Sequence, residues 1–235
     1  MNKGKLYLIP TLLADISPDH ALPLSTLEVI RRLDYFIIEE LRTARRFLKK
    51  AGIQKQIEDI EFNIYNEHTK NKDLLPYLNP ALEGHDIGLL SEAGTPCIAD
   101  PGHLLVEYAH QLNIRVIPLP GPSSLFLALM ASGFNGQNFS FVGYIPIERN
   151  LRIKRIRELE KLVREKDQTQ ICIETPYRNN QLFAAITEIC QNDTRLCLAV
   201  NMTAENEWIA VKSIREWKKE KPDLNKQPAV FLLYH

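Results

Sequence analysis

Four loops rich in glycine, proline and hydroxyl groups are where this sequence would carry out chemistry. They are SEAGTP at 91–96, PGPSS at 120–124, ETPYR at 174–178 and NMT at 201–203, each directly after a short apolar run. Gly94 and Gly121 have no Cβ, so a ligand can approach the backbone closely. The prolines fix φ and stiffen the loops. Such loops suit a nucleoside-like ligand held mainly by main-chain groups, and the alternative is that they are only tight strand-to-helix turns.

Short apolar runs and amphipathic helical stretches alternate along the chain, and these elements must position the loops. We expect strands at 5–11, 34–40, 60–68, 85–94, 114–118, 168–176, 195–203, 208–213 and 227–235. We expect helices at 24–32, 41–52, 74–84, 101–114, 124–134, 150–166 and 178–192, with a short one near 214–220. The alternation predicts the α/β class, with mixed or mostly parallel sheets.

The domain organisation follows from the same pattern. We expect two α/β domains, residues 1–118 and 119–235, joined near PLPGPSS at 118–124. In open α/β sheets, ligands bind outside the carboxyl ends of the strands. Because the four loops follow successive strands, a ligand-binding cleft is favoured over four unrelated turns.

The charge balance limits the kind of partner. The chain has 235 residues with 29 Lys plus Arg and 29 Asp plus Glu, so its net charge is zero. A protein that grips nucleic acid without specificity is usually basic overall. The balance therefore argues against that mode of binding and leaves room for a local basic patch.

Cysteine spacing and hydropathy point to a cytoplasmic protein. The four cysteines, Cys97, Cys172, Cys190 and Cys197, show no C-x-x-C spacing, so we expect no metal site and unpaired thiols in a reducing cytosol. No apolar run approaches the roughly 20 residues of a membrane span. The first residues faintly resemble a signal peptide, but Pro10 interrupts the apolar run, and we expect a buried first strand instead.

Several common nucleotide and hydrolase motifs are missing from the sequence. No G-x-G-x-x-G follows the first strand, which argues against a dinucleotide site of the Rossmann type. The chain also lacks a phosphate-binding G-x-x-x-x-G-K-[ST] and a G-x-S-x-G nucleophile elbow.

The segment SEAGTPCIADPG at 91–102 resembles the S-D-A-G-T-P-x-I-S-D-P-G signature of the tetrapyrrole-methylase superfamily. The likeness is closer to the branch that methylates the ribose 2′-OH of a cytidine in bacterial small-subunit ribosomal RNA. Further segments are similar to motifs of that branch: GKLYLI at 4–9, IEELR at 38–42, YNEHT at 65–69, PLPGPSS at 118–124, FVGYIP at 141–146 and ETPYR at 174–178.

The resemblance implies a methyltransferase with S-adenosylmethionine in the cleft between two α/β domains, an RNA substrate and a homodimer. The cofactor contacts that it implies in the first domain are Ala93, Gly94, Thr95, Pro96 and Ile98, and the loop after the next strand would contribute Ser123 and Ser124. In the second domain they are Glu174, the stretch 201–203 with Met202 and Thr203, and Ala229.

A ribose hydroxyl is a poor nucleophile until it loses its proton, so a nearby base would help. The candidates are Glu40, Glu67, Glu92 and Asp100. Glu92 lies beside the cofactor loop and is the preferred base, with plain surface placement as the alternative. For Asp100 we favour a structural role, capping the following helix through a side-chain oxygen.

Glu39 and Arg42 stand where the family has the Glu and Arg of A-E-D-T-R. They would shape the acceptor site or form an ordinary helix pair. The stretch RNLRIKRIRELEKLVREK at 149–166, with eight Lys or Arg and three Glu, is either an RNA-facing surface or a solvated helix.

The first loop departs from the family pattern, which reads A-T-P-I-G-N-L. Here it reads PTLLADI at 10–16, with Leu12 for Pro, Ala14 for Gly and Asp15 for Asn. The donor-binding loops are therefore kept, whereas the loop expected on the acceptor side differs. The alternatives are a methyltransferase for another acceptor, including a tetrapyrrole-like small molecule, and a non-catalytic protein that binds S-adenosylmethionine.

Overall fold

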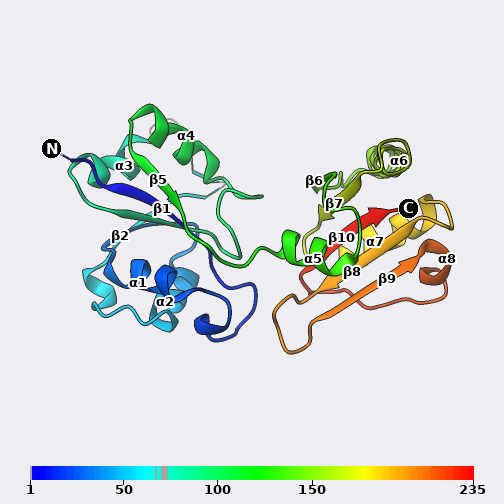
Figure 1. The fold of residues 1–235 in the computed structure, drawn as a ribbon, viewed down its shortest axis with the longest axis horizontal. Helices are drawn as coiled ribbons and strands as arrows, with labels where there is room; N and C mark the ends of the chain where they lie inside the picture. The colour runs from blue at the N-terminus through cyan, green and yellow to red at the C-terminus, as the bar shows by residue number, and fades with distance from the viewer. Residues whose placement is uncertain (1, 67, 70–73) are drawn as a thin grey trace. The chain divides into compact units, whose positions relative to one another are not determined.

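The structure is a computed structural model that describes residues 2–66, 68–69 and 74–235 (Figure 1). The chain divides into two compact units, Met1–Ser123 and Ser124–His235, called here the N-terminal and C-terminal units. Each unit contains a five-stranded sheet covered by helices.

The sheet of the N-terminal unit is parallel throughout. Its strands are β1 (Lys5–Ile9), β2 (Tyr35–Ile38), β3 (Glu61–Ile64), β4 (Ile87–Leu90) and β5 (Arg115–Pro118), in the order β3-β2-β4-β1-β5. The expected first strand is confirmed, and it lies inside the sheet between β4 and β5. Because all five strands run the same way, the loops that follow them lie at one edge of the sheet.

Two helices cover each face of this sheet. On one face, α1 (Leu24–Arg32) and α2 (Leu41–Lys50) pack against strand residues such as Tyr7 and Phe36. On the other face, α3 (Leu75–Leu82) and α4 (His103–Gln111) pack against residues such as Leu6 and Ile37. Neighbouring strand residues thus serve opposite cores, as the period of two requires. Short 3₁₀ turns, η1 (Pro18–His20) and η2 (Ile57–Asp59), complete the described elements of this unit.

The sheet of the C-terminal unit is mixed. Its strands are β6 (Phe139–Tyr144), β7 (Thr169–Ile173), β8 (Arg195–Val200), β9 (Trp208–Ser213) and β10 (Ala229–Tyr234), in the order β6-β7-β10-β8-β9. Strand β6 pairs parallel with β7, whereas β10 runs antiparallel to both β7 and β8. The predicted class, α/β with mixed and parallel sheets, is confirmed.

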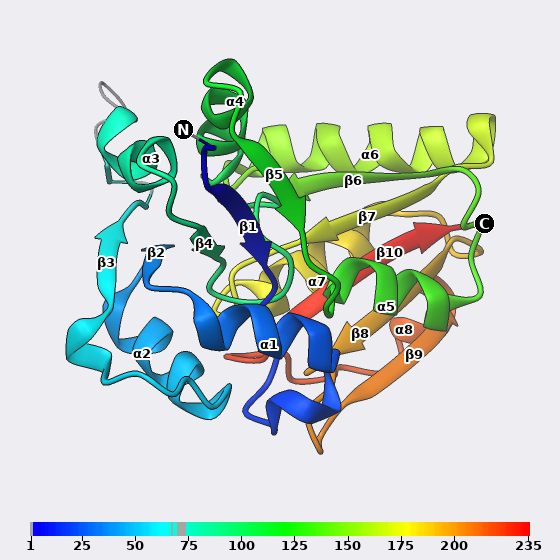
Figure 2. The same cartoon turned by 60° about the vertical axis from the view of Figure 1, so that its left-hand side comes forward.

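Helices again cover both faces of the second sheet. One face packs against α6 (Arg149–Lys166), α7 (Asn179–Ile189) and the short α8 (Ile214–Trp217), with Trp217 and Phe231 fully buried in that core. On the other face, α5 (Ser124–Ser132) packs against β8, β9 and β10 (Figure 2).

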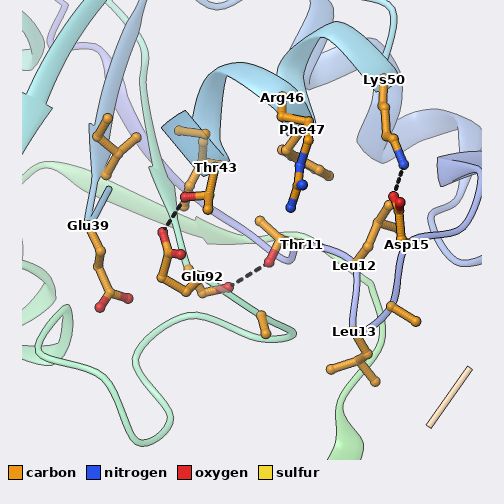
Figure 3. Close-up of a pocket in the computed structure, with 16 residues that line it drawn as sticks. Thr11, Leu12, Leu13, Asp15, Glu39, Thr43, Arg46, Phe47, Lys50 and Glu92 are labelled. Carbon is orange, nitrogen blue, oxygen red and sulfur yellow. Dashed lines mark hydrogen bonds and ion pairs between the residues drawn. The ribbon is translucent and has the colours of Figure 1, made fainter. Parts of the chain in front are cut away.

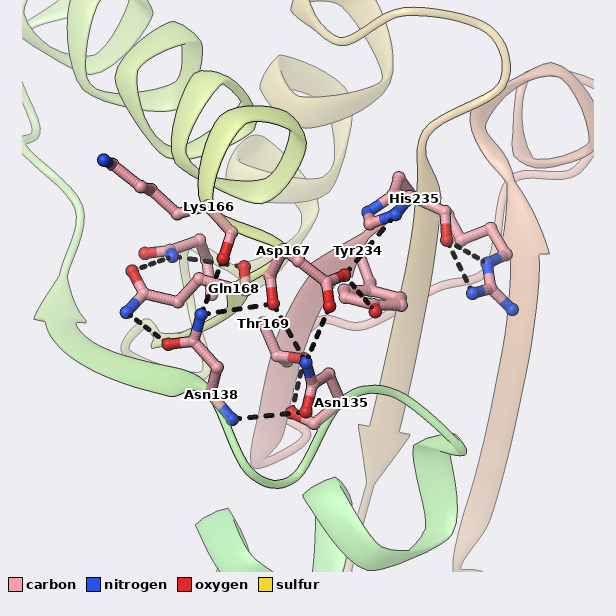
Figure 4. A network of polar contacts seen from close by, with 10 residues as sticks. Asn135, Asn138, Lys166, Asp167, Gln168, Thr169, Tyr234 and His235 are labelled. Atoms are coloured by element: carbon pink, nitrogen blue, oxygen red, sulfur yellow. Dashed lines mark hydrogen bonds and ion pairs between the residues drawn. The ribbon is translucent and has the colours of Figure 1, made fainter.

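Strand β6 is not among the strands expected from the sequence. It lies at the edge of the sheet, and its pairing with β7 shifts register between Phe141 and Tyr144. An edge strand with an irregularity and a glycine has no continuous apolar run to signal it. Its start is fixed instead by polar contacts: the Asn135 side-chain amide donates to Asp167, and that of Asn138 donates to the Lys166 carbonyl (Figure 4).

No helix in the described ranges is both long and apolar enough to cross a membrane.

Candidate functional site

The loops after β1 and β4 are tied together at the carboxyl edge of the N-terminal sheet. The backbone N–H of Thr11 donates to the Gly94 carbonyl over 2.9 Å, and the Ser91 hydroxyl donates to the same carbonyl over 2.5 Å. The side chains of Thr11 and Ser91 are both buried, and their hydroxyl oxygens lie 3.3 Å apart. The predicted cofactor loop is therefore anchored by the loop whose sequence departs from the family pattern.

Gly94 is the point where three loops meet. Its φ is +73°, a conformation that side chains disfavour. A Cβ there would lie 3.0 Å from Leu13 Cδ2 and 3.4 Å from the Pro122 carbonyl oxygen. Gly94 thus lets the loops after β1, β4 and β5 approach one another.

Asp100 holds the second half of the motif together, but not as a helix cap. Its carboxylate accepts from the N–H of Cys97 at 2.8 and 2.9 Å and from the N–H of Gly102 at 2.8 Å. The residue at the N-cap of α4 is Gly102, with no side-chain hydrogen bond, so the predicted capping role is corrected to bracing of the preceding turn. Burial raises the pKa of Asp100, although these two backbone hydrogen bonds lower it.

The other predicted residues of this loop differ in exposure. Pro96 is buried and Thr95 half-buried, whereas Ala93 and Ile98 are exposed. Ser123 is buried at the end of the N-terminal unit, and Ser124 is the first residue of α5 in the C-terminal unit.

A cavity of about 260 Å³ opens at the same edge of the N-terminal sheet (Figure 3). Its lining comes from the loop after β1, the ends of β2 and β4, and α2: Thr11, Leu12, Leu13, Ala14, Asp15, Ile38, Glu39, Thr43, Ala44, Arg46, Phe47, Lys50, Leu90, Ser91, Glu92 and Ala93. An ion pair between Lys50 and Asp15 joins α2 to the first loop. The hydrogen bond from Lys50 lowers the pKa of Asp15.

Thr43 connects two of the predicted catalytic carboxylates. Its hydroxyl donates to Glu92 Oε1 over 2.8 Å, and its backbone N–H donates to Glu40 Oε2 over 2.9 Å. Glu92 lines the cavity, whereas Glu40 is the N-cap of α2. Hydrogen bonds from the backbone N–H groups of Thr43 and Arg42 lower the pKa of Glu40. The position of Thr43 had no signal in the sequence, because only the fold brings α2 beside the end of β4.

The remaining acceptor-side candidates are separated. Glu39 lines the cavity and lies before the first helical residue, so it is not part of a pair within the helix with Arg42. Arg42 is exposed in the first turn of α2 and is not among the residues that line the cavity. Glu67 lies outside the described residues.

In the C-terminal unit, strand register brings the predicted residues to one edge. Ala229 is paired with Val200, and Val230 with Ile173. Glu174, the 201–203 stretch and Ala229 therefore adjoin one another, and Met202 and Ala229 are each only 7% exposed. The Asn201 side-chain amide donates to Gln227 Oε1 over 2.8 Å and joins the two segments.

Two observations at this edge favour a bound polar ligand. Thr203 has φ +71°, and its buried hydroxyl has no hydrogen-bond partner within the described parts of the chain. An unsatisfied buried hydroxyl of this kind calls for a missing partner. The Glu174 side chain is 6% exposed and is held by Arg178 Nη2 at 2.5 Å and by the Thr175 N–H at 2.7 Å. Stiff backbone, small side chains and an open hydroxyl fit a nucleoside with hydrogen-bonding groups.

The described cysteines and acids do not gather into a metal site. Among the described residues, no group of three or more His, Cys, Asp or Glu side chains is arranged to hold a metal ion. All four thiols are unpaired, and burial raises the pKa of Cys97, in the motif loop, to about 12.

This fold and these loop motifs define a family. The chain belongs to the tetrapyrrole methylases, because residues 6–217 match the family model described as "Tetrapyrrole (Corrin/Porphyrin) Methylases". It is a methyltransferase whose methyl donor is S-adenosylmethionine, as the sequence motifs predict.

Particular relatives narrow the comparison. The chain is 30% identical over 233 residues to "Ribosomal RNA small subunit methyltransferase I" of Haemophilus influenzae, covering 98% of this chain and 78% of that one. It is 31% identical to the protein of the same name from Thermotoga maritima, covering 93% of this chain and 94% of that one. The solved uroporphyrin-III C-methyl transferase of Thermus thermophilus, complexed with S-adenyl homocysteine, superposes with a TM-score of 0.63 at 16% identity, over 99% of this chain and 98% of that one. At that identity, the last likeness shows the fold alone.

Proposed function

We propose that this protein methylates a ribose 2′-hydroxyl of small-subunit ribosomal RNA. The supporting observation is 30% identity, across 98% of the chain, to a small-subunit ribosomal RNA methyltransferase. The tetrapyrrole-like alternative has weaker support, because it depends on fold similarity at 16% identity.

We propose that the loops at the two sheet edges hold the cofactor. In the N-terminal unit they are the main chain around Ala93, Gly94, Thr95, Pro96 and Ile98, together with Ser123, and the next residue, Ser124, opens the C-terminal unit. In the C-terminal unit, the Thr203 hydroxyl is the clearest candidate donor, with Met202 and Ala229 supplying apolar contact and Glu174 a fixed carboxylate. When bound, S-adenosylmethionine supplies an electrophilic methyl group on a positively charged sulfur.

We assign the proton acceptor to Glu92. It lines the cavity, and its Oε1 accepts a hydrogen bond from Thr43, which fixes the carboxylate while Oε2 stays available to a substrate hydroxyl. Alignment of donor and acceptor supplies most of the catalysis in such a displacement. A base of this kind contributes a further factor of about 10² to 10⁴. Glu40 acts one step away, because it positions Thr43 at the start of α2.

The test is methyl transfer to small ribosomal subunits isolated from cells that lack this gene. With S-adenosylmethionine carrying a tritiated methyl group, we expect label in the ribosomal RNA at one ribose, mapped as resistance to alkaline hydrolysis. Glu92→Gln should lower kcat by about 10²-fold or more with little change in cofactor affinity. Glu61→Gln, at an exposed position of β3 outside the lining of the cavity, is the matched control and should keep full activity.

The outcomes separate the remaining possibilities. If the protein binds S-adenosylmethionine in calorimetry but leaves the RNA unlabelled, RNA methylation is wrong. Label on a porphyrin-type acceptor would then support the tetrapyrrole reading, and no turnover with either acceptor would support a non-catalytic binding protein.

We also propose a cytoplasmic homodimer. The family resemblance supports the dimer. Three buried, unpaired cysteines support the cytoplasmic location: Cys172, Cys190 and Cys197. Light scattering of the purified protein tests the dimer, for which the expected mass is twice 27.0 kDa.

A further inference from the structure

Helix α2 carries a basic stripe whose charges are largely unbalanced. Its ten residues include five cations and no acid: Arg42, Arg45, Arg46, Lys49 and Lys50. Spacings of three and four place these side chains along one side of the helix. Ala44, Phe47 and Leu48 bury the opposite side in the core of the N-terminal unit.

The stripe gains little from its own surroundings. Within the described ranges, Lys50 pairs with Asp15, whereas Arg42, Arg45, Arg46 and Lys49 form no ion pair. Like charges four residues apart destabilise a helix. The pairs Arg42–Arg46, Arg45–Lys49 and Arg46–Lys50 all have that spacing. Arg45 lies over the Phe62 ring at 5.8 Å, and Lys49 and Lys50 in the last turn are favoured by the helix dipole. Four of the five cations nevertheless have no carboxylate partner in the described structure, and an anionic partner outside the chain would supply one.

The longer helix α6 has the same net charge of +5, from eight cations and three acids, and some of its cations are paired. Its eight cations include Arg155, which pairs with Glu158 at 2.8 Å, and Lys161, which pairs with Glu165 at 3.8 Å. Arg164 is held 2.8 Å from Asp193. Its charge is thus partly neutralised within the C-terminal unit, as the solvated-helix alternative requires.

Two residues of the basic stripe also reach the cavity. Arg46 and Lys50 line that cavity, and Figure 3 shows the Arg46 guanidinium pointing from α2 toward the loop that carries Thr11 and Leu12. From Arg42 to Lys50 the stripe extends about 12 Å at 1.5 Å per residue. Cations therefore continue along the surface from the cavity that contains Glu92.

We propose that the basic stripe of α2 binds the phosphate backbone of the RNA substrate beside the nucleotide that is methylated. This inference rests on the proposed function. It names the surface of the N-terminal unit that holds the RNA, and it assigns the charge of α6 to solvation. Arginine and lysine contacts to phosphate supply much of the affinity of such complexes, and each is sensitive to salt.

The test compares two matched double variants for binding and turnover. Arg45→Gln with Lys49→Gln removes an Arg and a Lys from the stripe that do not line the cavity. Lys154→Gln with Arg157→Gln removes an exposed Arg and Lys from α6 that form no ion pair in the described structure. Both change the net charge by the same amount. Fluorescence anisotropy of end-labelled protein, titrated with small ribosomal subunits from 50 to 300 mM KCl, gives affinity and salt slope.

For the α2 variant we expect about tenfold weaker binding at 100 mM KCl and a salt slope shallower by about 1.4, for two lost contacts at roughly 0.7 each. KM for the subunits should rise with kcat nearly unchanged, and S-adenosylmethionine affinity should stay at the wild-type value. The α6 variant should bind within twofold of the wild type.

Two results would overturn the inference. One is an α2 variant that binds subunits within twofold of the wild type, and the other is an α6 variant weakened as much as the α2 variant. In both cases the wild type still methylates the RNA, so the proposed function survives. Wild-type protein that neither binds nor methylates the subunits removes the proposed function, and this inference with it.

Discussion

A side chain at Gly94 would meet two neighbouring loops at once. The residue has φ +73°, with Leu13 and the Pro122 carbonyl 3.0 and 3.4 Å from the position of a Cβ. We expect Gly94→Ala to lower the free energy of unfolding by about 1 to 2 kcal/mol from backbone strain. We also expect it to weaken S-adenosylmethionine binding by about tenfold or more, because the three loops must shift. Urea denaturation and calorimetry measure the two effects.

Gly133 provides a matched control for that substitution. It has φ +68°, and nothing lies within 4 Å of the position of a Cβ. Gly133→Ala should therefore show the same backbone strain with unchanged cofactor affinity. Equal affinities in the two variants would mean that the contacts of Gly94 have no part in binding the cofactor.

At the scale of single elements, the short helix α8 depends on its cap. The Ser213 side chain accepts from the Glu216 N–H, and the Glu216 carboxylate accepts from the Ser213 N–H, which forms a capping box. This box fixes a four-residue helix that buries Ile214 and Trp217 in the core of the C-terminal unit.

We expect Ser213→Ala to lower the free energy of unfolding by about 1 kcal/mol, since it leaves helix N–H groups without a partner. Ser213→Thr keeps the hydroxyl and should stay close to the wild type. Urea denaturation of both variants tests this. Equal losses in the two would assign the effect to strand β9, which ends at Ser213, rather than to the cap.

Most elements were predictable from sequence because they are strongly patterned. Strands such as β4, with four buried apolar residues in a row, can be predicted from the apolar run in the sequence. The edge strand β6 does not, because it is only half-buried and irregular. The N-cap of α4 is Gly102, two residues after the predicted Asp100. Short proline- and glycine-rich loops allow several capping arrangements, and only the fold selects one.

The candidate site was predictable in its loops and not in its cavity. The motif residues 91–96 and 201–203 are contiguous in sequence, so their resemblance to a family could be recognised. The cavity combines Ser91, Glu92 and Ala93 of the first motif with Thr43, Arg46 and Lys50 of α2, about 45 residues earlier in the chain. No local pattern connects Thr43 with Glu92, because their contact depends on β2 and β4 being neighbours in the sheet.

At the scale of the whole molecule, two self-contained cores support the proposal of two domains. Each compact unit has buried hydrophobic clusters of its own, two in the N-terminal unit and one in the C-terminal unit. The sequence places the boundary after residue 118, which stays a prediction. The net charge of zero hides an uneven distribution, since α2 carries five cations and no acid.

Stability should fall in acid. Within the described parts of the chain, six carboxyl groups have a lowered pKa, each from hydrogen bonds that favour the ionised form: Asp15, Glu40, Glu148, Asp193, Glu216 and Asp223. Below their ordinary values of 3.8 and 4.5, the unfolded chain binds more protons than the folded chain, so their stabilisation is lost as pH drops. Asp100 acts in the opposite direction, because burial raises its pKa and ionisation costs stability.

Because the six carboxyl groups with a lowered pKa outnumber Asp100, we expect the urea concentration at the unfolding midpoint to decrease from pH 6 to pH 3.5. The control is Asp100→Asn, which removes the opposing group. The stability of this variant relative to the wild type should be higher at pH 6 than at pH 3.5, because Asp100 of the wild type becomes protonated at the lower pH. A midpoint that rises on acidification would contradict the prediction.

The position of β10 has a consequence for synthesis of the protein. This strand lies between β7 and β8 and supplies hydrogen bonds to both, yet it follows the other four strands of its sheet in sequence. Domains generally fold as units while the polypeptide emerges from its N-terminal end. The N-terminal unit can thus fold while translation continues, whereas the C-terminal sheet lacks its central strand until β10 has been synthesised.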